Sequence, residues 1–238
     1  METMRTVRGR TRRPDSGAIE GRPASWTAGL AWAGIIGPVL FTATFIGQEA
    51  LRRSEYNPLA ETVSALEAGP NGWVQQVNFV VFGLLTMAFA VGLQLGLRRT
   101  RLGLLGPALL FTSGIGLLLA AGFPLREDAA GVTYDPGGHI VAGLTFFLTS
   151  AIGLIAVSRR LARDPRWRGL ARYTLAAGVA SLLGFFVMGA LVMPDAAPLH
   201  AWAGVAQRAL ILLVLFPCRV VLSLRLRRLV RGRHGGEA

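Results

Sequence analysis

Residues 76–123 read QVNFVVFGLLTMAFAVGLQLG, then LRRTR, then LGLLGPALLFTSGIGLLLAAGF. Both apolar runs exceed the roughly 18 residues that an α-helix needs to cross a hydrocarbon layer about 30 Å thick. A helix satisfies its own backbone hydrogen bonds in lipid, so such runs predict helices and not strands. The arginine-rich segment between them is short enough to be a tight turn. This stretch therefore predicts two antiparallel membrane-spanning helices.

Similar apolar runs occur along the whole 238-residue chain. They cover residues 26–47, 139–157, 171–193 and 202–222. Only 16% of the residues are charged, compared with about 25% in soluble domains. We therefore predict an all-α polytopic transmembrane bundle of about six helices in residues 26–224. A disordered, arginine-rich cytoplasmic tail is expected at residues 1–25 and a basic cytoplasmic tail at residues 225–238.

The formal net charge of +12 does not indicate nucleic-acid binding. The basic residues are all arginine, and they gather at the ends of the apolar runs, as in loops that lie against a membrane surface. Arginines crowd both tails and the second and fourth loops, whereas the other loops hold only Arg52, Arg53 and Arg126. Cytoplasmic loops carry the excess of positive residues. We therefore expect a multi-pass protein of the cell membrane with both termini in the cytoplasm.

The first outer loop, residues 48–75, is the longest and has the clearest local pattern. Its Ser64-Ala-Leu-Glu67 segment fits a capping box, in which the serine and glutamate side chains each bind a free backbone amide. This pattern predicts a short surface helix over the outer end of the bundle. Ser64 as a nucleophile would need a base beside it, and no neighbour in the sequence supplies one. A structural lid is therefore the favoured interpretation.

Arg208 lies within the last apolar run, and ten uncharged residues separate it from Arg219. At 1.5 Å per residue the two arginines are about 16 Å apart along a helix, well short of a hydrocarbon layer about 30 Å thick. We expect Arg219 to extend toward the cytoplasmic surface. An arginine at the centre of a membrane helix costs about 2.5–3.5 kcal/mol. Arg208 therefore either pairs with a carboxylate, for which Glu49, Asp128 and Asp195 are candidates, or extends to the outer headgroups.

These considerations predict a polar cluster in the outer half of the bundle, made of Arg208, Gln207, His139 and one of Asp128 or Glu49. The full set of candidate binding residues is Glu49, Ser64, Asn78, Asp128, His139, Gln207 and Arg208. No catalytic residue is assigned. His139 and His200 with the outer carboxylates could hold a metal, but the ligand spacing typical of zinc sites is missing. No metal and no cofactor are therefore predicted.

Several short motifs occur in and after the first outer loop. They are Tyr56-Asn-Pro-Leu59, Thr62-Val-Ser-Ala-Leu66, the segment from Gly69 to Phe79, the element from Phe123 to Asp128, His139, and Gly204 followed by Gln207-Arg208. Together they resemble a bacterial and archaeal membrane family called domain of unknown function 998, over about residues 27–225. The resemblance implies a six-helix membrane protein with no established activity. It also supports the polar residues as a shared site.

Three classes of function stay open. The favoured class is a non-enzymatic membrane protein that binds a lipid or small molecule in the outer polar cavity. The second is an intramembrane metal-dependent hydrolase that uses His139 and Asp128, with His200 and Ser64 as further participants. The third is a small transporter in which Arg208 and a carboxylate form a coupled pair. The expected partners are the lipid bilayer and such a ligand, and the oligomeric state is left open.

Overall fold

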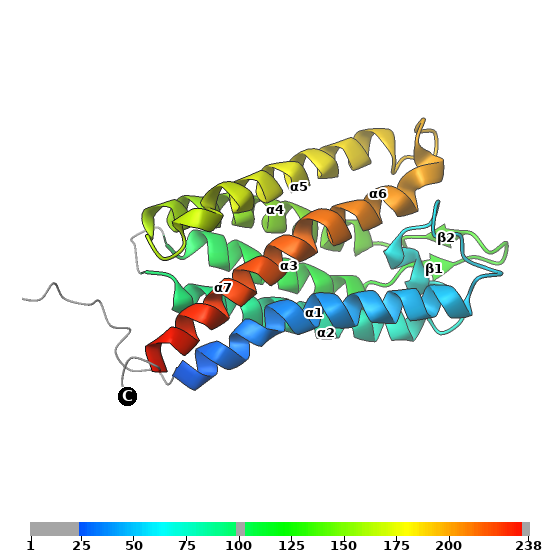
Figure 1. Ribbon diagram of the computed structural model, residues 1–238. Helices are drawn as coiled ribbons and strands as arrows, with labels where there is room; N and C mark the ends of the chain where they lie inside the picture. Colours follow the sequence, from blue (N-terminus) through cyan, green and yellow to red (C-terminus); the bar gives the residue numbers. More distant parts are fainter. Residues whose placement is uncertain (1–23, 99–102, 235–238) are drawn as a thin grey trace, which may run out of the picture.

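The computed structural model describes residues 24–98 and 103–234. Within these residues, six helices are long and apolar enough to cross a membrane, which confirms the predicted all-α transmembrane fold (Figure 1). The predicted tail at residues 1–25 lies almost entirely outside the described residues, and so do residues 235–238 of the predicted C-terminal tail.

Five of the spans are single α-helices joined by loops. They are α1 (Ala24–Leu51), α2 (Gly72–Gly96), α3 (Leu105–Gly122), α4 (His139–Arg163) and α5 (Ala171–Leu191). The loops contain the 3-10 helices η1 (Val63–Glu67) and η2 (Arg168–Leu170) and the strands β1 (Arg126–Glu127) and β2 (Thr133–Tyr134). The two strands form a small antiparallel hairpin, in which Arg126 pairs with Tyr134 and Glu127 with Thr133.

The sixth span is built from four consecutive helical segments. The 3-10 helix η3 (His200–Trp202) leads into α6 (Ala203–Ala209), the π-helix η4 (Leu210–Leu215) and α7 (Phe216–His234). A π-turn closes hydrogen bonds between residues five apart, so it contains about one residue more than an α-turn. One extra residue rotates the faces of α7 by roughly 100° relative to an uninterrupted α-helix. The helix also continues past residue 224, where the membrane domain was predicted to end.

Consecutive spans pack side by side from α1 to α5, and the sixth span returns against α1 to close the bundle. Figure 1 shows the β1–β2 hairpin, the α1–α2 connection and the α5–α6 connection together at one end of the bundle. We call this end the hairpin end. The start of α1 and the end of α7 lie together at the opposite end (Figure 1).

Close contact between α3 and α4 depends on Gly116. A Cβ atom at this position would lie 2.7 Å from the backbone nitrogen of Phe146 and 3.0 Å from the carbonyl oxygen of Ala142. Because backbone atoms cannot swing aside as the tip of a side chain can, any larger residue forces the two helices apart. Small residues at such positions let membrane helices approach closely.

The loops at the opposite end of the bundle are held by a buried arginine. Arg160, near the end of α4, donates hydrogen bonds to the carbonyl groups of Leu97, Arg98 and Gly103 and to Gln94 Oε1. In the sequence Arg160 is one of many positive residues that flank the spans. In the structure it ties α4 to residues 97 and 98 just after α2 and to Gly103 shortly before α3.

Phenylalanine side chains fill the centre of the bundle toward the hairpin end. The ring centroid of Phe82 in α2 lies 4.7 Å from that of Phe41 in α1 and 5.2 Å from that of Phe216 in α7. These separations are typical of favourable ring packing. The cluster joins α1 and α2 to the sixth span, and two of its members, Phe41 and Phe82, line a pocket.

Candidate functional site

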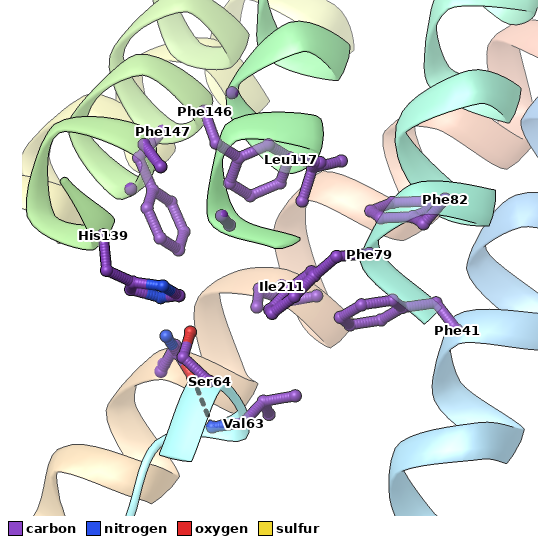
Figure 2. Close-up of a pocket in the computed structure, with 15 residues that line it drawn as sticks. Phe41, Val63, Ser64, Phe79, Phe82, Leu117, His139, Phe146, Phe147 and Ile211 are labelled. Atoms are coloured by element: carbon purple, nitrogen blue, oxygen red, sulfur yellow. Dashed lines mark hydrogen bonds between the residues drawn. The ribbon is translucent and has the colours of Figure 1, made fainter. Parts of the chain in front are cut away.

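A pocket lies within the bundle near the hairpin end (Figure 2). Residues of α1, η1, α2, α3, α4 and the sixth span line it. The lining includes five phenylalanines and three polar residues, which are Phe41, Phe79, Phe82, Phe146, Phe147, Ser64, His139 and Gln207. The cavity has a volume of about 40 Å³, which is room for a few water molecules or a few atoms of a ligand.

His139, the first residue of α4, contacts a buried carboxyl group of η1. Its Nδ1 atom lies 3.2 Å from Glu67 Oε2 and 3.0 Å from the carbonyl oxygen of Phe123. A backbone carbonyl can only accept a hydrogen bond, so Nδ1 carries the hydrogen in the tautomer that bonds to Phe123. In the neutral ring Nε2 is then an acceptor. Figure 2 shows the ring extending into the pocket toward Ser64.

Glu67 is the residue of this site whose role the sequence-based interpretation mistook. The predicted capping box is wrong: Thr62 precedes η1 without a side-chain cap, and Glu67 accepts a hydrogen bond from the Leu125 amide at 3.4 Å. Four residues of η1, among them Glu67, are buried, so most of this short helix faces inward. Residues three apart eclipse each other in a 3-10 helix. This geometry places Ser64 and Glu67 on one side of η1, and the spacing of three was the signal available in the sequence.

Burial raises the pKa of the Glu67 carboxyl from 4.5 to about 8, and the hydrogen bond from Leu125 offsets only part of the rise. The carboxyl group is therefore mostly protonated at neutral pH. Its Oε1 atom is buried and has no hydrogen-bond partner among the described residues. A neutral carboxyl group with one unused oxygen can bond to a polar ligand or to water.

We expect Glu67 to make the folded protein less stable as the pH rises. Between pH 4.5 and about 8 the folded state holds a proton on Glu67 that the unfolded state has lost. Protonated Glu67 thus contributes its full stabilisation of the folded protein below pH 4.5, the pKa in the unfolded state. This contribution is lost as the pH rises through about 8, the pKa in the folded state. The change is at most about 1.4 kcal/mol per pH unit. Denaturant titrations in detergent, followed by tryptophan fluorescence, measure it.

The matched variants for this prediction are Glu67→Gln and Glu127→Gln. Glu127 is an exposed carboxylate of β1, so its replacement should leave the pH dependence unchanged. Glu67→Gln should remove the fall in stability between these pH values. A Glu67→Gln protein with the wild-type slope would show that another group is responsible.

Ser64 and Gln207 bring a hydroxyl and an amide group to the same pocket. The Val63 amide donates to Gln207 Oε1 at 2.7 Å, which joins η1 to α6. The NH₂ group of Gln207 forms no hydrogen bond within the described part of the chain. Figure 2 shows Ser64 facing His139 across the pocket. Hydrogen-bonding groups from η1, α4 and α6 therefore line one pocket.

Arg208 pairs with Glu49, one of the two carboxylates predicted for its cluster. The guanidinium donates to Glu49 Oε1 at 2.6 and 3.1 Å, to the Tyr56 hydroxyl at 2.5 Å and to the Glu61 carbonyl at 2.8 Å. The Tyr56 hydroxyl lies 2.8 Å from the carbonyl oxygen of Thr62, to which it donates. Burial raises the pKa of Tyr56 to about 12 despite the opposing charge of Arg208. This network attaches the loop before η1 to the sixth span.

Asp128 and Asn78 lie outside this arrangement. Asp128 is exposed and accepts hydrogen bonds from two backbone amides of the hairpin turn, each at 2.9 Å. Such a pattern is typical of an aspartate that shapes a turn, and the alternative in which Asp128 pairs with Arg208 is wrong. Asn78 is buried in α2, where it donates to the Phe41 carbonyl and to Gln75 Oε1, both at 3.1 Å. It joins α2 to α1.

Asp135 supports the site, although the sequence did not single it out. Its carboxylate accepts hydrogen bonds from the amides of Gly137, His139 and Ile140 at 2.8, 3.3 and 2.9 Å. Burial alone would raise the pKa of Asp135, but these hydrogen bonds lower it overall. The carboxylate satisfies free amides at the start of α4 and so fixes the backbone that carries His139.

His139 and His200 have different partners. His200 Nδ1 lies 3.2 Å from the Val192 carbonyl oxygen, and its Nε2 lies 3.9 Å from Asp195 Oδ1. Across residues 24–98 and 103–234, no group of three or more His, Cys, Asp and Glu side chains is placed to hold a metal ion. The residues considered for a metal-dependent hydrolase therefore do not form one ligand set in the described chain.

The fold and the pocket define a six-span membrane protein with a histidine-containing polar site buried at one end of its helical bundle. The chain belongs to DUF998, a family of proteins of unknown function, whose family model matches residues 35–223. This match confirms the resemblance seen in the sequence motifs, and its range includes the whole pocket and the Arg208–Glu49 pair. No curated protein and no solved structure matches the chain.

Proposed function

We propose that this protein binds an amphiphilic molecule, a polar group of which enters the pocket at the hairpin end. The observation that carries the proposal is the convergence of Ser64, His139 and Gln207 from three separate segments on one aromatic cavity. Apolar pockets with a few convergent polar groups are typical of small-molecule sites. The unpartnered Oε1 of Glu67 adds hydrogen-bonding capacity. A ligand head group with both donors and acceptors suits this set.

The volume of the cavity limits what the pocket holds. A cavity of about 40 Å³ takes only a few non-hydrogen atoms in this conformation. Recognition of a head group is therefore better supported than complete enclosure of an acyl chain, which would require the phenylalanine side chains to move.

Photoactivatable, clickable phospholipid and fatty-acid analogues test the proposal in detergent micelles. Gly143 lines the pocket, and a Cβ atom there meets no atom within 4 Å. Gly143→Leu is therefore expected to block the pocket without a backbone clash and to reduce labelling of the pocket peptides strongly. Gly189→Leu is the matched control, because Gly189 is an exposed glycine of α5 with equally open surroundings. Equal labelling of wild type and both variants would contradict the proposal.

One observation favours hydrolysis of an ester or amide ligand as a second candidate function. Ser64 faces His139 in Figure 2, and Glu67 and the Phe123 carbonyl hold Nδ1 of that histidine. A serine, a histidine and an orienting carboxyl group are the parts of a hydrolytic triad. In this candidate reaction Ser64 Oγ attacks the carbonyl carbon, and His139 Nε2 takes its proton and passes it to the leaving alcohol or amine. Water then releases the acyl group from Ser64 by the same steps.

A fluorophosphonate probe and a chromogenic ester distinguish hydrolysis from binding alone. If the second candidate is right, wild type is labelled and turns over the ester. Ser64→Ala should lose both activities, and His139→Gln should lose about 100-fold or more in rate. Ser54→Ala, at an exposed position in the same loop, should behave as wild type. Wild-type protein without labelling or turnover would reject hydrolysis and leave the binding proposal in place.

We further propose that the hairpin end faces away from the cytoplasm, because arginines gather in the segments at the opposite end. Single cysteines introduced at Asp128 and Arg231, both exposed, test this orientation in a Cys218→Ser background. A membrane-impermeant maleimide should label the first in intact cells and the second only after permeabilisation. The reverse labelling pattern would show that the hairpin end faces the cytoplasm and would contradict this proposal.

A further inference from the structure

Arg219 is buried near the middle of the bundle. Its side chain donates a hydrogen bond at 2.7 Å to the hydroxyl of Thr86, which lies near the midpoint of α2. The guanidinium carbon also lies 4.8 Å from the ring centre of Phe82 and 5.5 Å from that of Phe89. Arg219 is only 7% exposed. The expectation that it extends toward the cytoplasmic surface is therefore wrong.

The positive charge of Arg219 has no acidic partner in the described chain. The ion pairs found there involve Arg166, Arg208 and two histidines, and none involves Arg219. Of the five N–H groups of a guanidinium, the hydrogen bond to Thr86 uses one. The two aromatic rings compensate the charge in part. An unpaired charge remains costly within a membrane, where ionisable groups mark functional sites.

A small void adjoins Arg219. Its lining includes Arg219, Phe89, Phe216 and Ser150. Its volume is about 10 Å³, close to the space that one water molecule or one ion of similar size needs. Ser150 is 3% exposed, and its Oγ atom has no hydrogen-bond partner within residues 24–98 and 103–234. A positive charge and an unused hydroxyl donor therefore line the same void.

We propose that this void binds one small monovalent anion of the size and charge of chloride. The free N–H groups of Arg219 and the hydroxyl of Ser150 are all donors, so they suit an acceptor that carries negative charge. A water molecule would accept one or two of these hydrogen bonds but would leave the charge unbalanced. The void is too small for phosphate or a lipid headgroup. This site does not depend on the function proposed for the pocket at the hairpin end.

Thermal unfolding of the purified full chain in sodium chloride and in sodium gluconate at equal ionic strength tests the proposal. An anion that binds only the folded state stabilises it by mass action. Chloride is therefore expected to raise the Tm by several degrees relative to gluconate, and bromide should do the same. In crystals grown with bromide, an anomalous scattering peak is expected beside Arg219 and Ser150.

Three variants make the test specific. Arg219→Met removes the charge and should abolish the difference between the two salts. Ser150→Val fills the void while Arg219 remains, so it should also reduce the difference in Tm between the two salts. This variant tests the anion site if Arg219→Met does not fold. Arg228→Met, at an exposed position of α7, should retain the wild-type difference. Equal Tm values for wild type in chloride and gluconate, or an undiminished difference in Ser150→Val, would overturn the proposal.

Discussion

Replacing Arg208 with methionine is expected to lower the free energy of unfolding by about 3 kcal/mol, at the lower end of the range for breaking a buried ion pair. The side chains of Arg208 and Glu49 are 13% and 17% exposed, so water screens the pair only weakly. Methionine keeps only an apolar side chain similar to the aliphatic part of arginine. The Glu49 carboxylate therefore loses its donor, and the Glu61 carbonyl loses its hydrogen bond from Arg208. Reversible unfolding in mixed micelles, followed by tryptophan fluorescence, measures the loss.

A double-mutant cycle with Glu49→Gln separates the ion pair from the other contacts of Arg208. If the stranded carboxylate causes most of the loss, the double variant should be more stable than Arg208→Met alone. Arg53→Met is the matched control, because Arg53 is exposed in the loop that follows α1 and its replacement should change stability by less than about 0.5 kcal/mol. Strictly additive effects of the two changes at Arg208 and Glu49 would show that the pair contributes nothing as a pair.

The Arg208 network matters to function because it sets the position of η1. The loop before η1 is also joined to the sixth span by the Val205 amide, which donates to the Leu59 carbonyl at 3.1 Å. Gly204 permits this approach, since a Cβ atom there would lie 2.4 Å from the carbonyl oxygen of Glu61. These contacts lie directly before the segment that carries Ser64 and Glu67. The described geometry therefore gives Arg208 a role in holding the site together, and this is the role we favour over transport.

The spans were predictable because their length and apolar character are imposed by the bilayer and require no knowledge of neighbours. The Arg208–Glu49 pair was predictable for a related reason, since a charge at that depth needs a partner and most of the carboxylates of the chain lie in the segments at that end of the bundle. The choice between Glu49 and Asp128 was not predictable. It depends on the hairpin turn, whose backbone amides occupy the Asp128 carboxylate.

Glu67 and Arg219 show where the sequence was insufficient. The Ser64–Glu67 spacing suits both an α-helical capping box and an eclipsed pair in a 3-10 helix, and only the packing of η1 against α1, α2 and α6 decides between them. Arg208 and Arg219 are eleven positions apart and would share one face of a regular α-helix. The π-helix between them turns α7, so Arg208 faces the loop before η1 whereas Arg219 faces α2. Such a turn has no clear signature in an apolar sequence.

Gly116→Leu is expected to destabilise the protein by about 3 kcal/mol or more, because overpacking against fixed backbone atoms must separate two helices. The first added atom would already lie 2.7 Å from the Phe146 nitrogen, and the rest of the side chain makes the overlap worse. The same change should disturb the pocket, which Gly116 lines together with His139. Denaturant titration and the photolabelling experiment measure the two effects separately.

Gly143→Leu is the matched comparison, because both glycines line one pocket and differ in what surrounds their Cβ positions. No atom lies within 4 Å of a Cβ at Gly143, so this variant should fold with stability within about 1 kcal/mol of wild type, helped by the better helix propensity of leucine. It should nevertheless lose ligand labelling. The pair thus separates closing the pocket from forcing α3 and α4 apart. Similar stabilities for the two variants would mean that α3 and α4 do not meet at Gly116 as closely as described.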